Sequence, residues 1–153
     1  MKLYLVRHGQ AMEGLRDKER VLSAEGRREA GTLARYLLRT GVHVSEIWHS
    51  GKARACETAE ILREDGQLCE TIRERKGLSP NDSVDGLVHD LEVEHDDLCV
   101  VSHLPFVSTL ASALVTGGDA AAWSFHTCAM LSLEREGSGL WWVNGFVRPN
   151  DLE

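Results

Sequence analysis

The sequence predicts an α/β fold, a three-layer sandwich in which helices cover both faces of a mainly parallel mixed sheet, with an antiparallel hairpin late in the chain. Two observations lead to this fold class. Apolar runs of strand length alternate with amphipathic segments of helical period over most of the chain. The last part instead has two apolar segments around a glycine-rich turn. The length of 153 residues suits a single domain, residues 1–153.

The first predicted strand is the short apolar run Leu3–Val6, which stops where charged residues begin. A polar stretch follows, and then an amphipathic segment predicts a helix. Ser23 can cap this helix and Gly41 can end it, because serine favours the N-cap and glycine the left-handed conformation after the last turn. The apolar stripe with helical spacing consists of Ala30, Leu33, Ala34, Leu37 and Leu38.

The same alternation of strand and helix then repeats. Ile47–Trp48 predicts a second strand, and a helix that ends near Gly66 follows it. A third strand-like piece lies around Thr71–Ile72. The apolar side chains that line the second helix are Ala55, Ala59 and Leu62.

A fully apolar run, Leu98–Val101, predicts the most deeply buried strand of the sheet. Before it, a turn signal is followed by a short helix over Val84–Glu92. Two later segments, Cys128–Leu133 and Leu140–Val147, predict the hairpin. The stripe of the helix behind the buried strand consists of Val107, Leu110, Ala111, Leu114 and Val115.

The composition limits the partners and the location of the protein. The formal net charge of −7 opposes non-specific attraction to nucleic acid or to an anionic membrane, so neither is expected as a partner. The sequence has no apolar run of about eighteen residues and no signal-peptide pattern, so a cytoplasmic location is expected. The cysteines have no paired spacing and are expected to be reduced and mostly buried. They are Cys56, Cys69, Cys99 and Cys128.

Histidine and arginine side chains follow three of the predicted strands. Arg7-His8 comes after the first strand, residues 49–54 after the second, and Ser102-His103 after the fourth. In open α/β sheets, ligands bind beyond the carboxyl ends of the strands, so these groups are expected to converge. The sequence therefore predicts a cationic pocket for an anionic substrate, although the whole chain is acidic.

The three basic groups have characteristic local sequences. They read Arg7-His8-Gly9, then Ser50-Gly51-Lys52-Ala53-Arg54-Ala55 followed by Thr58, and finally Ser102-His103. In this order and setting they resemble the signature blocks of the histidine phosphatase (phosphoglycerate mutase-like) superfamily. The short length and the segments Trp48–Lys52, Leu78–Asp82 and Ser102–Pro105 are more similar to its SixA-type phosphohistidine phosphatases than to its mutases.

The resemblance implies roles for a small set of residues. His8 would attack phosphorus and form a transient phosphohistidine, because a neutral imidazole is a competent nucleophile and a good leaving group. Arg7 and Arg54 would bind the phosphate through their planar guanidinium groups. His103 would donate a hydrogen bond to a transferring oxygen. Ser102 either hydrogen-bonds to the pocket or simply ends a strand.

A departure from the wider family bears on the substrate. Many members place a glutamate after the third strand as the general acid, but none falls at that place here, and Asp82 is the nearest candidate. A phosphoryl group linked to nitrogen departs more readily than one linked to an alkyl oxygen, so a phosphohistidine needs less acid help. The short segment between Leu78 and Leu98 leaves no room for a large lid. We therefore expect a phosphohistidine-bearing protein, such as a phosphotransfer domain, as the substrate.

Alternatives remain for the function and for the other histidines. A phosphatase of small phosphomonoesters or anhydrides would use the same core, while the intact set of basic residues opposes a non-catalytic phosphate-binding module. The sequence contains no HExxH or CxxC spacing and no glycine-rich nucleotide motif, so no metal and no cofactor are expected. His49 and His126 either line the pocket or pack, and Thr58 is expected to be structural. The histidines in polar, surface-like settings are His43, His89 and His95.

Overall fold

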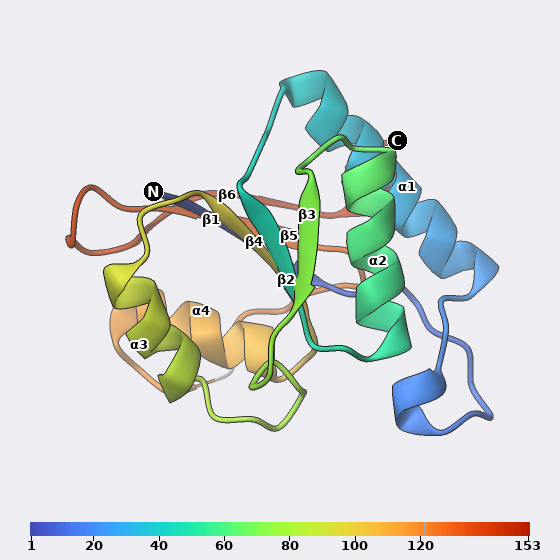
Figure 1. Cartoon of the computed structure of the whole chain (residues 1–153), viewed down its shortest axis with the longest axis horizontal. Helices are drawn as coiled ribbons and strands as arrows, with labels where there is room; N and C mark the ends of the chain where they lie inside the picture. The colour runs from blue at the N-terminus through green and yellow to red at the C-terminus, as the bar shows by residue number, and fades with distance from the viewer. Residues whose placement is uncertain (121) are drawn as a thin grey trace.

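The computed structural model describes residues 1–120 and 122–153, in which strands and helices alternate along most of the chain (Figure 1). The strands are β1 (Lys2–Arg7), β2 (Glu46–His49), β3 (Thr71–Glu74), β4 (Leu98–Ser102), β5 (Met130–Glu134) and β6 (Trp142–Val147). The α-helices are α1 (Ala24–Thr40), α2 (Ala53–Glu64), α3 (Asp85–Val93) and α4 (Phe106–Thr116). Every strand and helix expected from the sequence is therefore present.

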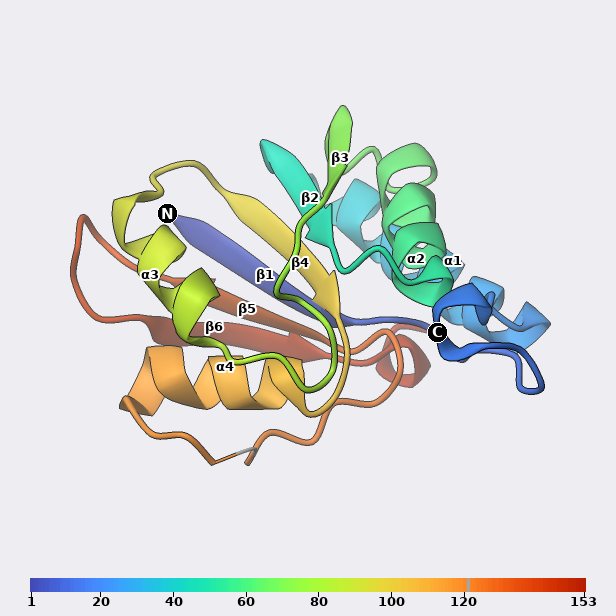
Figure 2. The same cartoon turned by 60° about the horizontal axis from the view of Figure 1, so that its bottom comes forward.

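All six strands form one sheet with the order β3-β2-β4-β1-β5-β6. The strands β1 to β4 are parallel, whereas β5 pairs antiparallel with β1, and β6 pairs antiparallel with β5. Helices α1 and α2 lie on one face of the sheet, and α3 and α4 lie on the other (Figures 1 and 2). The predicted three-layer sandwich with a mainly parallel sheet and a late hairpin is confirmed.

Strand β1 shows why the sheet needs helices on both faces. Leu3 and Leu5 pack in the core beneath α3 and α4, while Tyr4 and Val6 pack in the core beneath α1 and α2. Successive side chains of a strand point to opposite faces, so a strand buried on both faces is apolar throughout. Strand β4 obeys the same rule, and its residues are at most 1% exposed. The prediction that it is the most deeply buried strand is confirmed.

Helix α1 begins and ends where the sequence predicts. The Oγ of Ser23 accepts a hydrogen bond of 3.0 Å from the amide of Gly26, and Gly41 ends the helix with a φ of 70°. The expected stripe is buried except for Leu38, which is 46% exposed. Leu38 lies at the margin of the stripe, where the helix surface turns away from the sheet.

The start of the hairpin differs from the prediction. Strand β5 begins at Met130 rather than at Cys128, because Cys128 has a φ of 56° and forms a turn. The amide of Cys128 donates a hydrogen bond of 2.9 Å to the carbonyl of Arg7. The segment before β5 is thereby held against the end of β1.

Two expectations from the composition can be compared with the structure. All four cysteines are free thiols, and Cys56 is the only one of them that is not buried. Within residues 1–120 and 122–153, no helix is long and apolar enough to cross a membrane.

The connections of the sheet create a crevice between β1 and β4. From β1 the chain passes through α1 to β2 on one side, and from β4 it passes through α4 to β5 on the other side. Loops that leave adjacent parallel strands in opposite directions leave a crevice beyond the carboxyl ends of those strands. The residues that follow β1 and β4 therefore face each other across it.

Two helical glycines give a test of how tightly the loop after β1 is packed. A Cβ atom on Gly26 would overlap the carbonyl oxygen of Gln10, whereas a Cβ atom on Gly86 would meet no atom within 4 Å. Gly26→Ala is expected to destabilise the protein by about 1 to 3 kcal/mol, because the loop must shift. Gly86→Ala in α3 is expected to be neutral or to stabilise by up to about 1 kcal/mol. Urea unfolding measures both, and equal free-energy changes would contradict this packing.

Candidate active site

The two histidines that follow β1 and β4 lie beside each other in the crevice. The ring centroids of His8 and His103 are 4.9 Å apart. The amide of His8 donates a hydrogen bond of 3.0 Å to the carbonyl of Ser102, which continues the pairing of β1 with β4 by one residue. Main-chain pairing thus brings together two side chains that are 95 positions apart in the sequence.

The hydrogen bond of the His8 ring fixes its tautomer. Its Nδ1 lies 2.6 Å from the carbonyl oxygen of Gly9, and a carbonyl oxygen can only accept, so Nδ1 carries the proton. Burial lowers the pKa of His8 to about 4, helped by the charges of Arg54 and Arg7 and opposed by the hydrogen bond to Gly9. At neutral pH the ring is therefore uncharged and has its lone pair on Nε2. A nucleophilic imidazole requires both properties.

Arg54 lies in the first turn of α2 and is only 4% exposed. Its Nη1 donates a hydrogen bond of 2.7 Å to the carbonyl of Asp17, and its Nη2 is 3.2 Å from Oδ1 of Asp17. The Nζ of Lys52 is 2.6 Å from Oδ2 of the same carboxylate, and Nη1 of Arg20 is 3.5 Å from Oδ1. The hydrogen bond from Lys52 is the largest cause that lowers the pKa of Asp17 to about 2. An ionised carboxylate of the protein therefore partly neutralises this cationic group.

Arg7, at the end of β1, is half-buried and has hydrogen-bonding capacity to spare. Its Nη1 donates a hydrogen bond of 2.9 Å to the carbonyl of Phe125. Its Nε is buried and has no hydrogen-bond partner in the described part of the chain. Burial lowers the pKa of the guanidinium, and the nearby Glu29 opposes this change. An arginine remains protonated in proteins, so Arg7 keeps its positive charge.

His103 is 1% exposed and uses only one of its ring nitrogens within the described structure. Its Nε2 is 2.6 Å from Oγ of Ser50, whereas its Nδ1 is buried without a partner. Burial lowers the pKa of His103 to about 2, and the positive charges of a protonated His8 and of Arg54 act in the same direction. His103 is therefore neutral in this structure.

Ser102 and Asp82, the weaker candidates, both hold the loop after β3. The Oγ of Ser102 donates a hydrogen bond of 2.6 Å to the carbonyl of Leu78. The Oδ2 of Asp82 accepts one of 2.9 Å from the amide of Ser79. Both hydrogen bonds favour a structural interpretation, and no hydrogen bond or ion pair in the described structure joins Asp82 to His8 or His103.

The structure also places Thr58 and the two histidines whose roles the sequence leaves open, His49 and His126. Thr58 accepts a hydrogen bond of 3.1 Å from the amide of Gly9 and donates one of 2.7 Å to the carbonyl of Arg54, so it ties the loop after β1 to α2. His49 is buried, and its Nδ1 accepts a hydrogen bond of 3.1 Å from the amide of Gly51. His126 is exposed, and its Nε2 lies 3.3 Å from Nη1 of Arg148.

Sequence reasoning missed Asp17 and the separate importance of Ser50. Asp17 belongs to a short 3-10 helix, Asp17–Glu19, inside a polar stretch whose sequence gives no periodic signal. Ser50 was part of a recognised block, but its partner lies 53 positions away. Only the folded chain brings these groups together.

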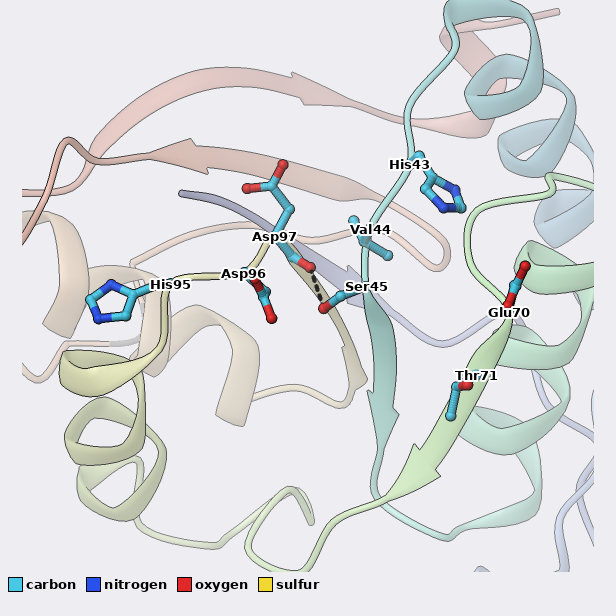
Figure 3. A pocket seen from close by; sticks show the side chains of 8 residues that line it. All are labelled: His43, Val44, Ser45, Glu70, Thr71, His95, Asp96 and Asp97. Carbon is cyan, nitrogen blue, oxygen red and sulfur yellow. Dashed lines mark hydrogen bonds between the residues drawn. The ribbon is translucent and has the colours of Figure 1, made fainter.

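A surface cavity of about 550 Å³ lies at the other end of the sheet, where β2, β3 and β4 begin (Figure 3). The rings of His43 and His95 are on opposite sides of the opening in Figure 3. Asp97 links the beginnings of neighbouring strands by hydrogen bonds. Its carboxylate accepts a hydrogen bond from the amide of Lys2, and its carbonyl oxygen accepts hydrogen bonds from Ser45. The side chains at this cavity are acidic rather than cationic, so it does not suit a phosphate. Across residues 1–120 and 122–153, no cluster of three or more histidine, cysteine, aspartate or glutamate side chains could hold a metal ion.

Comparisons with known proteins identify the family and the fold of the chain. Residues 3–79 match the model of the histidine phosphatase superfamily (branch 1). The protein histidine phosphatase SixA, solved as a complex with tungstate, superposes with a TM-score of 0.91 at 26% identity over 100% of both chains. A putative phosphohistidine phosphatase SixA from Agrobacterium tumefaciens has a TM-score of 0.80 at 22% identity over 97% of each chain.

A putative alpha-ribazole-5'-P phosphatase from Escherichia coli has the same fold. Its TM-score is 0.78 at 20% identity, over 97% of this chain and 98% of that one. No curated protein matches this chain.

The neutral state of His8 can be tested by titration. Because the native pKa of about 4 lies below the ordinary value of 6.5, the unfolded chain binds more protons between these values. Stability is therefore expected to fall as the pH decreases from about 6.5 towards 4, and the His8 ring is expected to stay neutral at pH 5. Ring NMR signals assigned with His8→Gln, and urea unfolding of both proteins, measure this. A His8 ring that titrates near 6.5 would contradict the electrostatics.

Proposed function

Because the chain belongs to the histidine phosphatase superfamily, we propose that it hydrolyses phosphohistidine on a protein through a covalent phospho-His8 intermediate. The observation that carries the proposal is the buried, neutral His8, whose Nε2 has no hydrogen-bond partner in the described structure and whose ring feels the positive charges of Arg54 and Arg7. The similarity in sequence and fold to a protein histidine phosphatase supports the same conclusion.

The reaction consists of two displacements at phosphorus. In the first, Nε2 of His8 attacks and its bond to phosphorus forms, while the bond to the substrate ring breaks and its electron pair returns to that ring, which is protonated on its other nitrogen and leaves as neutral imidazole. In the second, water attacks phospho-His8, inorganic phosphate leaves, and His8 returns to its starting state. Arg7 and Arg54 carry the positive charge that faces the equatorial oxygens, and His103 donates a hydrogen bond to one of them.

The lack of an evident proton donor favours nitrogen as the leaving atom. Asp17, beside Arg54, has its pKa lowered to about 2 and is ionised at neutral pH, so it cannot supply a proton. Asp82 is used in a turn. An imidazole leaving group can depart with little help from an acid, whereas an alkoxide depends on one. A phosphohistidine therefore suits this site better than an alkyl phosphate.

A second candidate is a phosphatase of small phosphomonoesters or anhydrides. It is favoured by the shared fold with the putative alpha-ribazole-5'-P phosphatase. In both cases Arg7, Arg54 and His103 supply the electrostatic stabilisation, and the proposal requires no metal ion.

The covalent intermediate can be trapped. Stopping the reaction in alkali during turnover is expected to leave phosphate on His8, since the N–P bond of a phosphohistidine survives alkali and breaks in acid. Peptide mapping locates the label, and His8→Ala is expected to be folded but inactive. Labelling of any other side chain would contradict the proposal, as would an active His8→Ala.

The substrate class can be tested by comparing two substrates that differ in their leaving group. With EDTA present, kcat/KM for a phosphohistidine peptide is expected to exceed that for an alkyl phosphomonoester by at least about 10²-fold, the low end of what general acid catalysis supplies. The monoester needs that acid and the phosphohistidine does not. A preference for the monoester would favour the second candidate. Activity that disappears with EDTA and returns with a metal ion would overturn the metal-free mechanism.

A further inference from the structure

The hydroxyl of Ser50 has two hydrogen-bond partners in the described structure. The amide of Lys52 lies 3.3 Å from Oγ, and Nε2 of His103 lies 2.6 Å from it. An amide N–H can only donate, so it uses a lone pair of the hydroxyl oxygen. The single hydroxyl proton is then left for Nε2 of His103.

The opposite direction of this hydrogen bond satisfies fewer groups. If Nε2 of His103 carried the proton and donated to Ser50, the hydroxyl proton of Ser50 would have no acceptor in the described part of the chain. Ser50 is half-buried and His103 is buried, and hydrogen-bonding groups in such places are usually arranged so that each donor has an acceptor. Donation from Ser50 is therefore the favoured direction.

This direction determines the tautomer of His103. With Nε2 as the acceptor, a neutral ring carries its proton on Nδ1. This Nδ1 is buried and has no hydrogen-bond partner within the described residues, and the ring lies next to that of His8. A buried donor without a partner costs free energy, so such a group indicates a place where a ligand atom completes the bond.

We propose that Ser50 is a positioning residue that makes His103 a neutral hydrogen-bond donor, with its Nδ1–H reserved for an oxygen of the transferring phosphoryl group. The inference deepens the proposed function, because it assumes a phosphoryl group at His8. A neutral donor adds no third full charge beside Arg7 and Arg54. It also leaves the neighbouring His8 uncharged and nucleophilic.

The neighbours of Ser50 restrict the conformation of the loop that carries it. Gly51 has a φ of 88°, which a residue with a side chain rarely adopts, and a Cβ there would overlap Glu74. The amide of Gly51 donates to Nδ1 of His49, which explains why a buried histidine ends β2. The loop is thus fixed on both sides of Ser50.

The test compares Ser50→Ala with Ser50→Thr, which keeps the hydroxyl, and with Ser45→Ala as the matched control. Ser45 lies just before β2 and hydrogen-bonds to Asp97, at the end of the sheet away from His8. The tautomer of His103 is read from the ¹⁵N shifts of its ring without substrate. Vanadate affinity and kcat for a phosphohistidine peptide are measured on the same proteins, and thermal melting verifies folding.

In the wild type, Nδ1 of His103 is expected to be protonated. In Ser50→Ala, the tautomer protonated at Nε2 is expected to gain population and kcat to fall about tenfold, less than the roughly 10²- to 10³-fold typical for loss of a whole oxyanion donor. Vanadate is expected to bind this variant more weakly, whereas Ser50→Thr and Ser45→Ala remain close to the wild type.

Two results would overturn the inference: a wild-type His103 protonated at Nε2, or a folded Ser50→Ala with unchanged kcat and vanadate affinity. A wild type that binds no vanadate and cleaves no phosphate would instead refute the proposed function. The tautomer measurement does not depend on that outcome, so the two failures can be distinguished.

Discussion

The parallel pairing of β1 with β4 is the constraint on which the rest of the site depends. It places His8 and His103 side by side in a crevice, where both side chains are buried, with His8 9% and His103 1% exposed. Burial is what lowers the pKa of each ring and keeps it neutral. The same packing that stabilises the fold therefore keeps His8 in the neutral state that the proposed nucleophile requires.

The electrostatics of the crevice oppose those of the molecule. The chain has a net charge of −7, yet Arg7, Arg54 and Lys52 gather near one end of the sheet. Asp17 lies against Lys52 and Arg54 and stays ionised, so part of this positive charge is balanced while the remainder faces the histidines. A local cluster of positive charge can attract a phosphoryl dianion even though the chain as a whole is acidic.

The fold was predictable because its signals are local. Apolar runs, helical stripes and the capping residues Ser23 and Gly41 each report on a few neighbouring positions. The errors have equally local causes: Leu38 sits at the margin of its stripe, and Cys128 adopts a turn that a strand-like composition does not reveal. The convergence of His8 and His103 followed from the rule for parallel sheets. The contacts of Asp17 and Ser50 could not be predicted, because they join groups 35 to 53 positions apart without a periodic pattern.

The stereochemical course at phosphorus tests the central claim most directly. Two in-line displacements, first by His8 and then by water, each invert the configuration at phosphorus, so hydrolysis of an isotopically chiral thiophosphoryl substrate in labelled water is predicted to proceed with net retention. Net inversion would show that water attacks the substrate directly. That result would contradict the account of His8 as a buried, neutral nucleophile that forms a covalent intermediate.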